Sequence, residues 1–193
     1  MPFLFNDYIP VLLINMAAGL LMLACYVAVG LEEADQRRWA PGFAMTGLVA
    51  LIGGFHMSFV WPLPGSYNIA YGELSVFFGI LFAGAALALA RGWDLLGVTI
   101  YAFLAGLCAI ILGIRIWDLG MSLTPRLTCV GFVLTGVAGL FSLPVLYLRN
   151  NRALRTLGVI VLVVAALIWI LIACRAYWQH LSGYAKWVPL MKE

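Results

Sequence analysis

The chain contains little charge. Only 10% of its 193 residues are Asp, Glu, Lys or Arg, and 65% are hydrophobic. A soluble domain carries about 25% charged residues, so this deficit excludes a soluble globular protein and predicts an integral membrane protein surrounded by lipid. The net charge of +3 is small and dispersed along the chain. This excludes nucleic acid as a partner, because nucleic-acid-binding proteins present a basic patch or stripe.

Signatures of catalysis are also missing. The chain has no Gly-x-Ser-x-Gly nucleophile turn, no phosphate-binding loop and no His-Glu-x-x-His zinc motif. Its four cysteines fall in separate apolar runs, without the Cys-x-x-Cys spacing of a zinc site. They are Cys25, Cys108, Cys129 and Cys174. These absences favour a protein that is not an enzyme, and the sequence supports no cofactor.

Six apolar runs are long enough to cross a bilayer core, which takes about 20 residues in a helix. They cover residues 9–31, 42–61, 69–90, 95–117, 127–148 and 156–177. The first run follows no Lys or Arg, so we expect a retained span rather than a cleaved signal peptide, which needs a basic segment. The segments between the runs are too short for a second domain. The sequence therefore predicts an all-α membrane protein in which residues 1–193 form one bundle of six transmembrane helices.

The distribution of Lys and Arg predicts the orientation, because these residues are enriched in cytoplasmic loops. With both termini outside, the inner loops hold Arg37, Arg38, Arg91, Arg149, Arg152 and Arg155. The outer side then holds Arg126, Lys186 and Lys192, with Arg115 and Arg175 near outer helix ends. We therefore predict that both termini lie outside a cell membrane, the inner membrane of a prokaryote.

The hairpin between the second and third runs, residues 54–73, carries two ionisable groups at membrane depth. His56 lies five residues before Trp61, and Glu73 lies five residues after Asn68. At 1.5 Å per residue, each lies about 7–8 Å inside the interface. Such groups are costly in lipid and usually face a partner or a cavity. We therefore expect the two side chains to meet across an antiparallel helix pair.

More polar residues gather at the same outer end. Arg115 and Asp118 are three residues apart, so they share a helix face. We predict that they complete an outward-facing polar pocket with His56 and Glu73, and that the apolar inner half closes this pocket as a plug. Supporting candidates are Asn15, Tyr67, Asn68, Arg126 and Arg175. Alternatively, the polar pairs only lock the helices in register.

Three functions fit such a chain. The leading hypothesis is a pocket that binds a small ligand, a lipid or quinone headgroup, or a partner subunit, which includes a second copy of the chain. A small-solute permease or channel is the first alternative, although a channel needs a polar or aqueous path through the whole depth. A redox subunit with a metal or haem is the second. Its candidate metal ligands are His56, Met57 and Glu73, and bis-histidine haem ligation would need His180 to fold back.

The hairpin also resembles a known family. Its Gly-Phe-His-Met and Trp-Pro-Leu-Pro-Gly-Ser-Tyr-Asn-Ile-Ala-Tyr-Gly-Glu segments, within residues 54–73, are similar to those of the prokaryotic integral membrane proteins labelled domain of unknown function 981. Residues 90–94, Ala-Arg-Gly-Trp-Asp, and 113–116, Gly-Ile-Arg-Ile, support the resemblance. It implies a multi-helix membrane fold and brings no activity.

Overall fold

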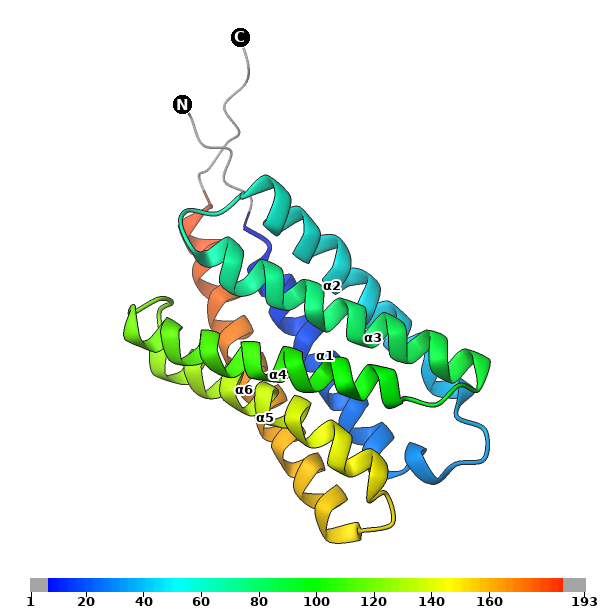
Figure 1. Ribbon diagram of the computed structural model, residues 1–193. Coiled ribbons are helices and arrows are strands. Elements are labelled where there is room, and N and C mark those ends of the chain that lie inside the picture. Colours follow the sequence, from blue (N-terminus) through cyan, green and yellow to red (C-terminus); the bar gives the residue numbers. More distant parts are fainter. Residues whose placement is uncertain (1–6, 186–193) are drawn as a thin grey trace.

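Six long helices form the structure, a computed structural model that describes residues 7–185 (Figure 1). They are α1 (Ile9–Ala28), α2 (Ala40–Val60), α3 (Leu74–Arg91), α4 (Leu96–Asp118), α5 (Pro125–Tyr147) and α6 (Arg152–Gly183). Two short 3-10 helices, η1 (Gly30–Glu32) and η2 (Arg37–Trp39), connect α1 to α2, and a π-helical segment, η3 (Asn68–Glu73), leads into α3. The six helices are long and apolar enough to cross a membrane, and no strand occurs within residues 7–185. The predicted all-α bundle of six spans is confirmed.

Proline, glycine and asparagine mark the helix ends. Pro10, Pro41 and Pro125 lie in the first turns of α1, α2 and α5, where the missing N–H costs no intrahelical hydrogen bond. α3 ends at Gly92, whose φ of 69° is left-handed and suits glycine. Asn151 caps α6, because its side chain accepts a hydrogen bond from the Leu154 N–H.

The sixth helix differs most from its predicted span of residues 156–177. α6 begins at Arg152 and continues to Gly183. His180, expected beyond the sixth helix, is therefore part of α6. Arg155, which the sequence assigned to a loop, lies in the first turns of α6.

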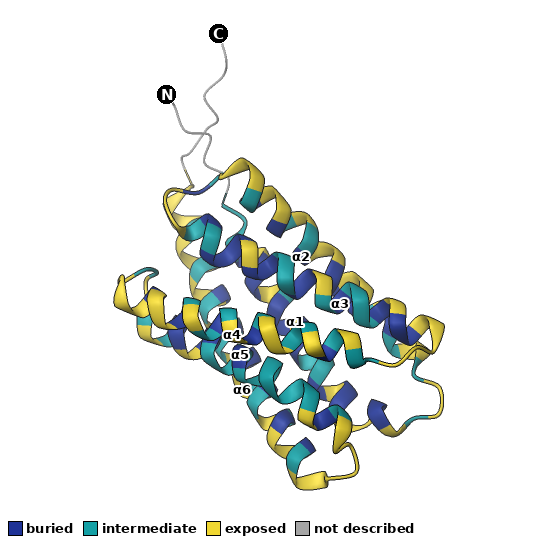
Figure 2. Ribbon diagram, viewed as in Figure 1, coloured by how far each residue is buried: buried dark blue, intermediate teal, exposed yellow. Residues whose placement is uncertain are grey.

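The helices pack most closely as three pairs: α2 with α3, α4 with α5, and α1 with α6. In Figure 1, α2 runs beside α3, and α4 runs beside α5. The α4–α5 pair approaches closely at Gly106 and Gly136. A Cβ atom added at either glycine would lie 2.5 Å from the carbonyl oxygen of the other, so only glycine permits this approach. Figure 2 shows that buried residues face neighbouring helices while exposed residues cover the outside.

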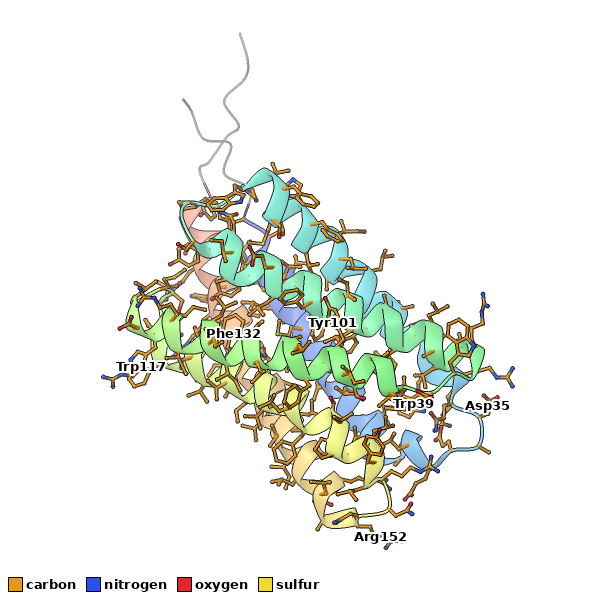
Figure 3. The ribbon with its side chains drawn as sticks, in the orientation of Figure 1. Asp35, Trp39, Tyr101, Trp117, Phe132 and Arg152 are labelled. Carbon is orange, nitrogen blue, oxygen red and sulfur yellow. The ribbon has the colours of Figure 1, made fainter. Side chains whose placement is uncertain are left out.

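The bundle has two distinct ends. The terminal end carries residues 7–8, the turns 61–67 and 119–124, and residues 180–185. The arginine-rich end carries the connections 29–39, 92–95 and 148–151. Six arginines lie at or beside these connections: Arg37, Arg38, Arg91, Arg149, Arg152 and Arg155. Arg152 points away from the bundle at this end in Figure 3.

Candidate functional site

His56 contacts the start of the first helix. Its Nδ1 lies 2.6 Å from the Tyr8 hydroxyl oxygen, and the two rings pack edge to face with centroids 5.5 Å apart. Tyr8 immediately precedes α1, and burial raises the pKa of its hydroxyl to about 12. The hydroxyl therefore keeps its proton at neutral pH, and this hydrogen bond ties α1 to α2.

Glu73 does not meet His56. Both side chains are exposed, and within residues 7–185 no hydrogen bond or ion pair joins them. The sequence argument placed both residues by depth alone, and rotation about the helix axis also decides a contact. Glu73 ends the π-helical segment η3, whose wider turns rotate the following residues relative to an α-helix. The expected His56–Glu73 contact is therefore wrong.

Arg115 and Asp118 share a face of α4, as predicted, and form an ion pair. Both side chains are exposed, so the pair lies outside any buried cluster. Trp117, between them, points away from the bundle in Figure 3. The structure thus does not assemble His56, Glu73, Arg115 and Asp118 as a buried group, and a ligand-binding role for them stays a prediction.

Two supporting candidates connect different elements. The Asn15 side-chain amide donates to the Thr46 carbonyl oxygen at 2.9 Å, which joins α1 to α2. The Tyr67 hydroxyl accepts a hydrogen bond from the Ser122 N–H at 3.1 Å, which joins the two turns of the terminal end. Both residues therefore hold the bundle together.

The other supporting candidates divide into a buried amide and two exposed cations. Asn68 is fully buried, and its side chain accepts from the Leu63 N–H at 3.1 Å and donates to the Leu63 and Gly65 carbonyl oxygens. It thereby closes the turn between α2 and α3. Arg126 and Arg175 are exposed, and the side chain of neither has a hydrogen bond or ion pair in the described part of the chain.

The three metal-ligand candidates do not converge either. Met57 is fully buried in the core, whereas its neighbour His56 is exposed and Glu73 lies on the next helix. Among residues 7–185, no group of three or more His, Cys, Asp or Glu side chains is placed to hold a metal ion.

The second histidine is also held by the residues that precede α1, which the sequence reasoning missed. Asp7 Oδ2 lies 3.3 Å from His180 Nε2, and its Oδ1 accepts a hydrogen bond from the Ile9 N–H. Burial and the nearby Asp7 carboxylate raise the pKa of Tyr184, whose ring packs against His180. Asp7 and Tyr8 thus each bind one histidine of the chain, which has two. The only sequence signal was a polar pair directly before the first apolar run.

A concavity lies in the other half of the bundle. It is a partly open cavity of about 160 Å³ lined by residues of all six helices. Most of the lining residues come from the helix halves that lie toward the arginine-rich end, for example Leu23 and Val27 from α1, Leu89 from α3 and Gly158 from α6. The apolar inner half, expected to be a plug, therefore contains a cavity.

A second cavity of about 60 Å³ lies toward the middle of the bundle. It shares a wall of α3, α4 and α5 residues with the larger one: Phe78, Leu81, Ala102, Thr135 and Gly139. Tyr101 lies beside this wall between α3 and α4 in Figure 3, and its ring packs edge to face against Phe77. The two cavities are therefore neighbours, and none of the four predicted pocket residues lines either of them.

The few polar side chains of the larger cavity are already hydrogen-bonded to protein groups. The Tyr26 hydroxyl donates to the Gln36 side-chain oxygen at 2.6 Å. Thr99, Thr135 and Ser142 donate to backbone carbonyl oxygens of their own helices at 2.6–2.9 Å. Because these hydroxyls are engaged, the cavity presents an almost entirely apolar surface.

A buried guanidinium lies beside this cavity at the arginine-rich end. Arg155 Nε donates to the carbonyl oxygen of Val27, a cavity residue, at 3.1 Å, and Nη2 donates to the Ala28 carbonyl oxygen. Nη1 pairs with the Glu32 carboxylate. Arg155 thus binds the free carbonyls at the C-terminal end of α1, where a positive charge is favourable.

The fold and cavity define a class: a bundle of six helices, each long and apolar enough to cross a membrane, around an apolar cavity. The family comparison is more specific. The family model described as "Protein of unknown function (DUF981)" matches residues 1–183, so the chain belongs to this family. No curated protein and no solved structure matches it.

Proposed function

We propose that this chain is a multi-pass membrane protein that binds the hydrocarbon chain of a lipid or isoprenoid amphiphile in its apolar cavity. The observation that carries the proposal is the cavity of about 160 Å³ whose hydroxyl groups are all engaged with the protein. An apolar cavity of about 150 Å³ is enough for a benzene-sized ligand. The smaller cavity extends the space by about 60 Å³ along the same wall, which suits an elongated chain better than a compact solute.

The site of this proposal differs from the predicted polar pocket. A permease for a small polar solute would need polar groups or water along its path, and the inner half of the bundle offers engaged hydroxyls instead. Binding a hydrocarbon chain requires only apolar contact, because closely packed apolar atoms attract one another through dispersion forces. The cavity therefore supports the binding of a hydrocarbon chain over the permeation of a polar solute.

Filling the cavity tests the proposal. Ala138 lines it from α5 and is half-buried, so Ala138→Leu adds bulk into empty space. Ala44→Leu on α2 is the matched control, because Ala44 is exposed and lies outside both cavities. Native mass spectrometry of protein extracted in neutral detergent should show co-purified amphiphile on the wild type and the control, and a reduced amount on Ala138→Leu.

A stability measurement separates this result from misfolding. A side chain that fills a true cavity leaves the melting temperature unchanged or raises it. Overpacking instead lowers the melting temperature, because it reduces the free energy of unfolding by about 1–3 kcal/mol. Equal amphiphile content in all three proteins would overturn the proposal. Solute uptake by proteoliposomes that is unaffected by Ala138→Leu would favour the permease.

We also propose that the arginine-rich end is cytoplasmic. It holds six arginines, against three at the terminal end of the described chain, Arg115, Arg126 and Arg175, and positive residues favour the cytoplasmic side. Single cysteines at Ser66 and Asn150, both exposed at opposite ends, test this in a cysteine-free background. In intact cells, a membrane-impermeant thiol reagent should label Ser66→Cys and not Asn150→Cys. The reverse pattern would invert the orientation.

A further inference from the structure

We propose that Arg155 selects the headgroup of the bound amphiphile, so that the ligand carries an anionic phosphate or carboxylate. This inference rests on the proposed chain-binding cavity. It concerns the polar end of the ligand, about which the cavity itself carries no information.

The guanidinium lies next to the cavity, behind the residues that line it. Arg155 binds the carbonyl oxygen of Val27, and Gly158 lies one turn further along α6; both Val27 and Gly158 line the cavity. The Arg155 side chain is only 9% exposed. A chain inserted in the cavity therefore places its headgroup beside a buried cation, provided that it enters from the arginine-rich end.

Glu32 supplies the only side chain among the partners of the guanidinium in the described chain, since the others are backbone carbonyl oxygens. The carbonyls of Val27 and Ala28 belong to the last turn of α1 and are fixed by that helix. Glu32, in contrast, lies on the short helix η1 and its side chain is 58% exposed. An exposed carboxylate can move into water at little cost, and an anionic headgroup then takes its place on Arg155. Two N–H groups of a guanidinium match the oxygens of a phosphate or carboxylate well.

The surrounding charge favours an anion. The Arg149 carbonyl oxygen accepts a hydrogen bond from Arg155 Nη1 at 3.4 Å, so Arg149 is adjacent. Its side chain is exposed and has no hydrogen bond or ion pair in the described chain. Arg37 and Arg38 are already paired with Asp35 and Glu33. Arg149 is therefore a second cation available to the headgroup.

The test compares two amphiphiles with the same chain. Dodecyl phosphate and the neutral dodecyl glucoside are titrated into protein in neutral detergent, with binding followed by native mass spectrometry, and inorganic phosphate is a third arm. Wild type should bind dodecyl phosphate at least about tenfold more tightly than the glucoside, because hydrogen bonds to charged groups are the strong ones. Arg155→Gln should abolish the preference. Inorganic phosphate alone should bind weakly, since it lacks the chain.

Two further variants keep the result interpretable if Arg155→Gln fails to fold. Glu32→Gln removes the competing carboxylate and should increase affinity for dodecyl phosphate several-fold, about three- to tenfold, without changing that for the glucoside. Arg152→Gln is the control, because Arg152 is an exposed arginine of the same turn. It should change the affinities for dodecyl phosphate and for the glucoside less than Glu32→Gln changes the affinity for dodecyl phosphate. A purely structural Arg155 predicts no change of preference in Glu32→Gln, and that result would overturn the inference.

The two proposals fail differently. If both probes bind equally and binding is still weakened by Ala138→Leu, the cavity holds a chain and the headgroup inference alone is wrong. If Ala138→Leu affects neither probe, chain binding in the cavity is wrong. If inorganic phosphate binds as tightly as dodecyl phosphate, the anion site is independent of any lipid, which also overturns the inference.

Discussion

The two ends of the bundle hold their charges in opposite ways. At the terminal end, the ion pair of Arg115 and Asp118 is exposed on α4, while a buried neutral amide, Asn68, orders the backbone of the turn. At the arginine-rich end, most charges are exposed, but Arg155 is buried and binds the backbone of another helix. The backbone is therefore held by a buried neutral side chain in the turn at one end and by a buried cation at the other.

Removing the buried cation should have the largest effect on stability. Arg155→Met keeps much of the aliphatic volume but leaves two carbonyls of α1 and the Glu32 carboxylate without this partner. We expect a loss of about 3 kcal/mol, since buried groups left unsatisfied cost about 1–3 kcal/mol each. Tryptophan-monitored thermal unfolding in detergent measures it.

Arg115→Met is the matched variant at the terminal end. Its pair with Asp118 is exposed, so we expect a loss below about 1 kcal/mol. If Arg115→Met lowered the melting temperature as much as Arg155→Met, the buried arginine would not contribute more to stability than the exposed one, and the two ends would not differ in this respect.

The buried amide of the terminal end should have the next largest effect. Asn68→Ala deletes three hydrogen bonds to the turn between α2 and α3, and we expect a cost of about 2 kcal/mol. Asn150→Ala is the control at the other end, because Asn150 is exposed and its side chain has no partner in the described chain. If the control lowers the melting temperature as much, the amide contacts are not what stabilises the turn.

These two residues also show what the sequence was able to predict. Run lengths predicted six spans, because apolar length alone decides whether a helix crosses a bilayer, and spacing of three residues predicted the Arg115–Asp118 pair. Arg155 counted only as a loop arginine, since nothing local reveals that its side chain reaches the end of α1. His56 and Glu73 were placed by depth alone, whereas the structure leaves both side chains exposed and without a hydrogen bond or ion pair between them in the described chain. Long-range contacts and helix rotation are set by packing of the whole bundle, which one sequence does not state.

The contact between Tyr8 and His56 should have a smaller effect. Tyr8→Phe removes the hydroxyl that contacts His56 Nδ1 and, at 3.4 Å, the Gly53 carbonyl oxygen at the partly exposed terminal end, so we expect a loss of about 1 kcal/mol at neutral pH. The effect should depend on pH. Tyr8 in the unfolded chain loses its proton near pH 10, and in the folded chain near pH 12.

The sign of that dependence follows from proton binding. Between these pH values the folded state retains a proton that the unfolded state has lost, so stability falls as pH rises. Below pH 10 the contribution of Tyr8 is complete. Wild type should therefore lose stability more steeply than Tyr8→Phe between pH 10 and 12, and parallel curves would contradict the burial of this hydroxyl.

The smallest effect should come from an exposed carboxylate at the arginine-rich end. The pKa of Asp35 is lowered by a hydrogen bond from the Arg37 N–H and then by the Arg37 guanidinium. Its contribution is therefore present at neutral pH and is lost as pH falls below the usual range of the carboxyl. Both partners are largely exposed, and salt screens such pairs. Asp35→Asn should consequently leave the melting temperature at pH 7 within experimental scatter, at low and at high salt. A large shift that disappears in high salt would mean that the whole charged connection stabilises this end, and the contrast between the ends would no longer rest on Arg155 alone.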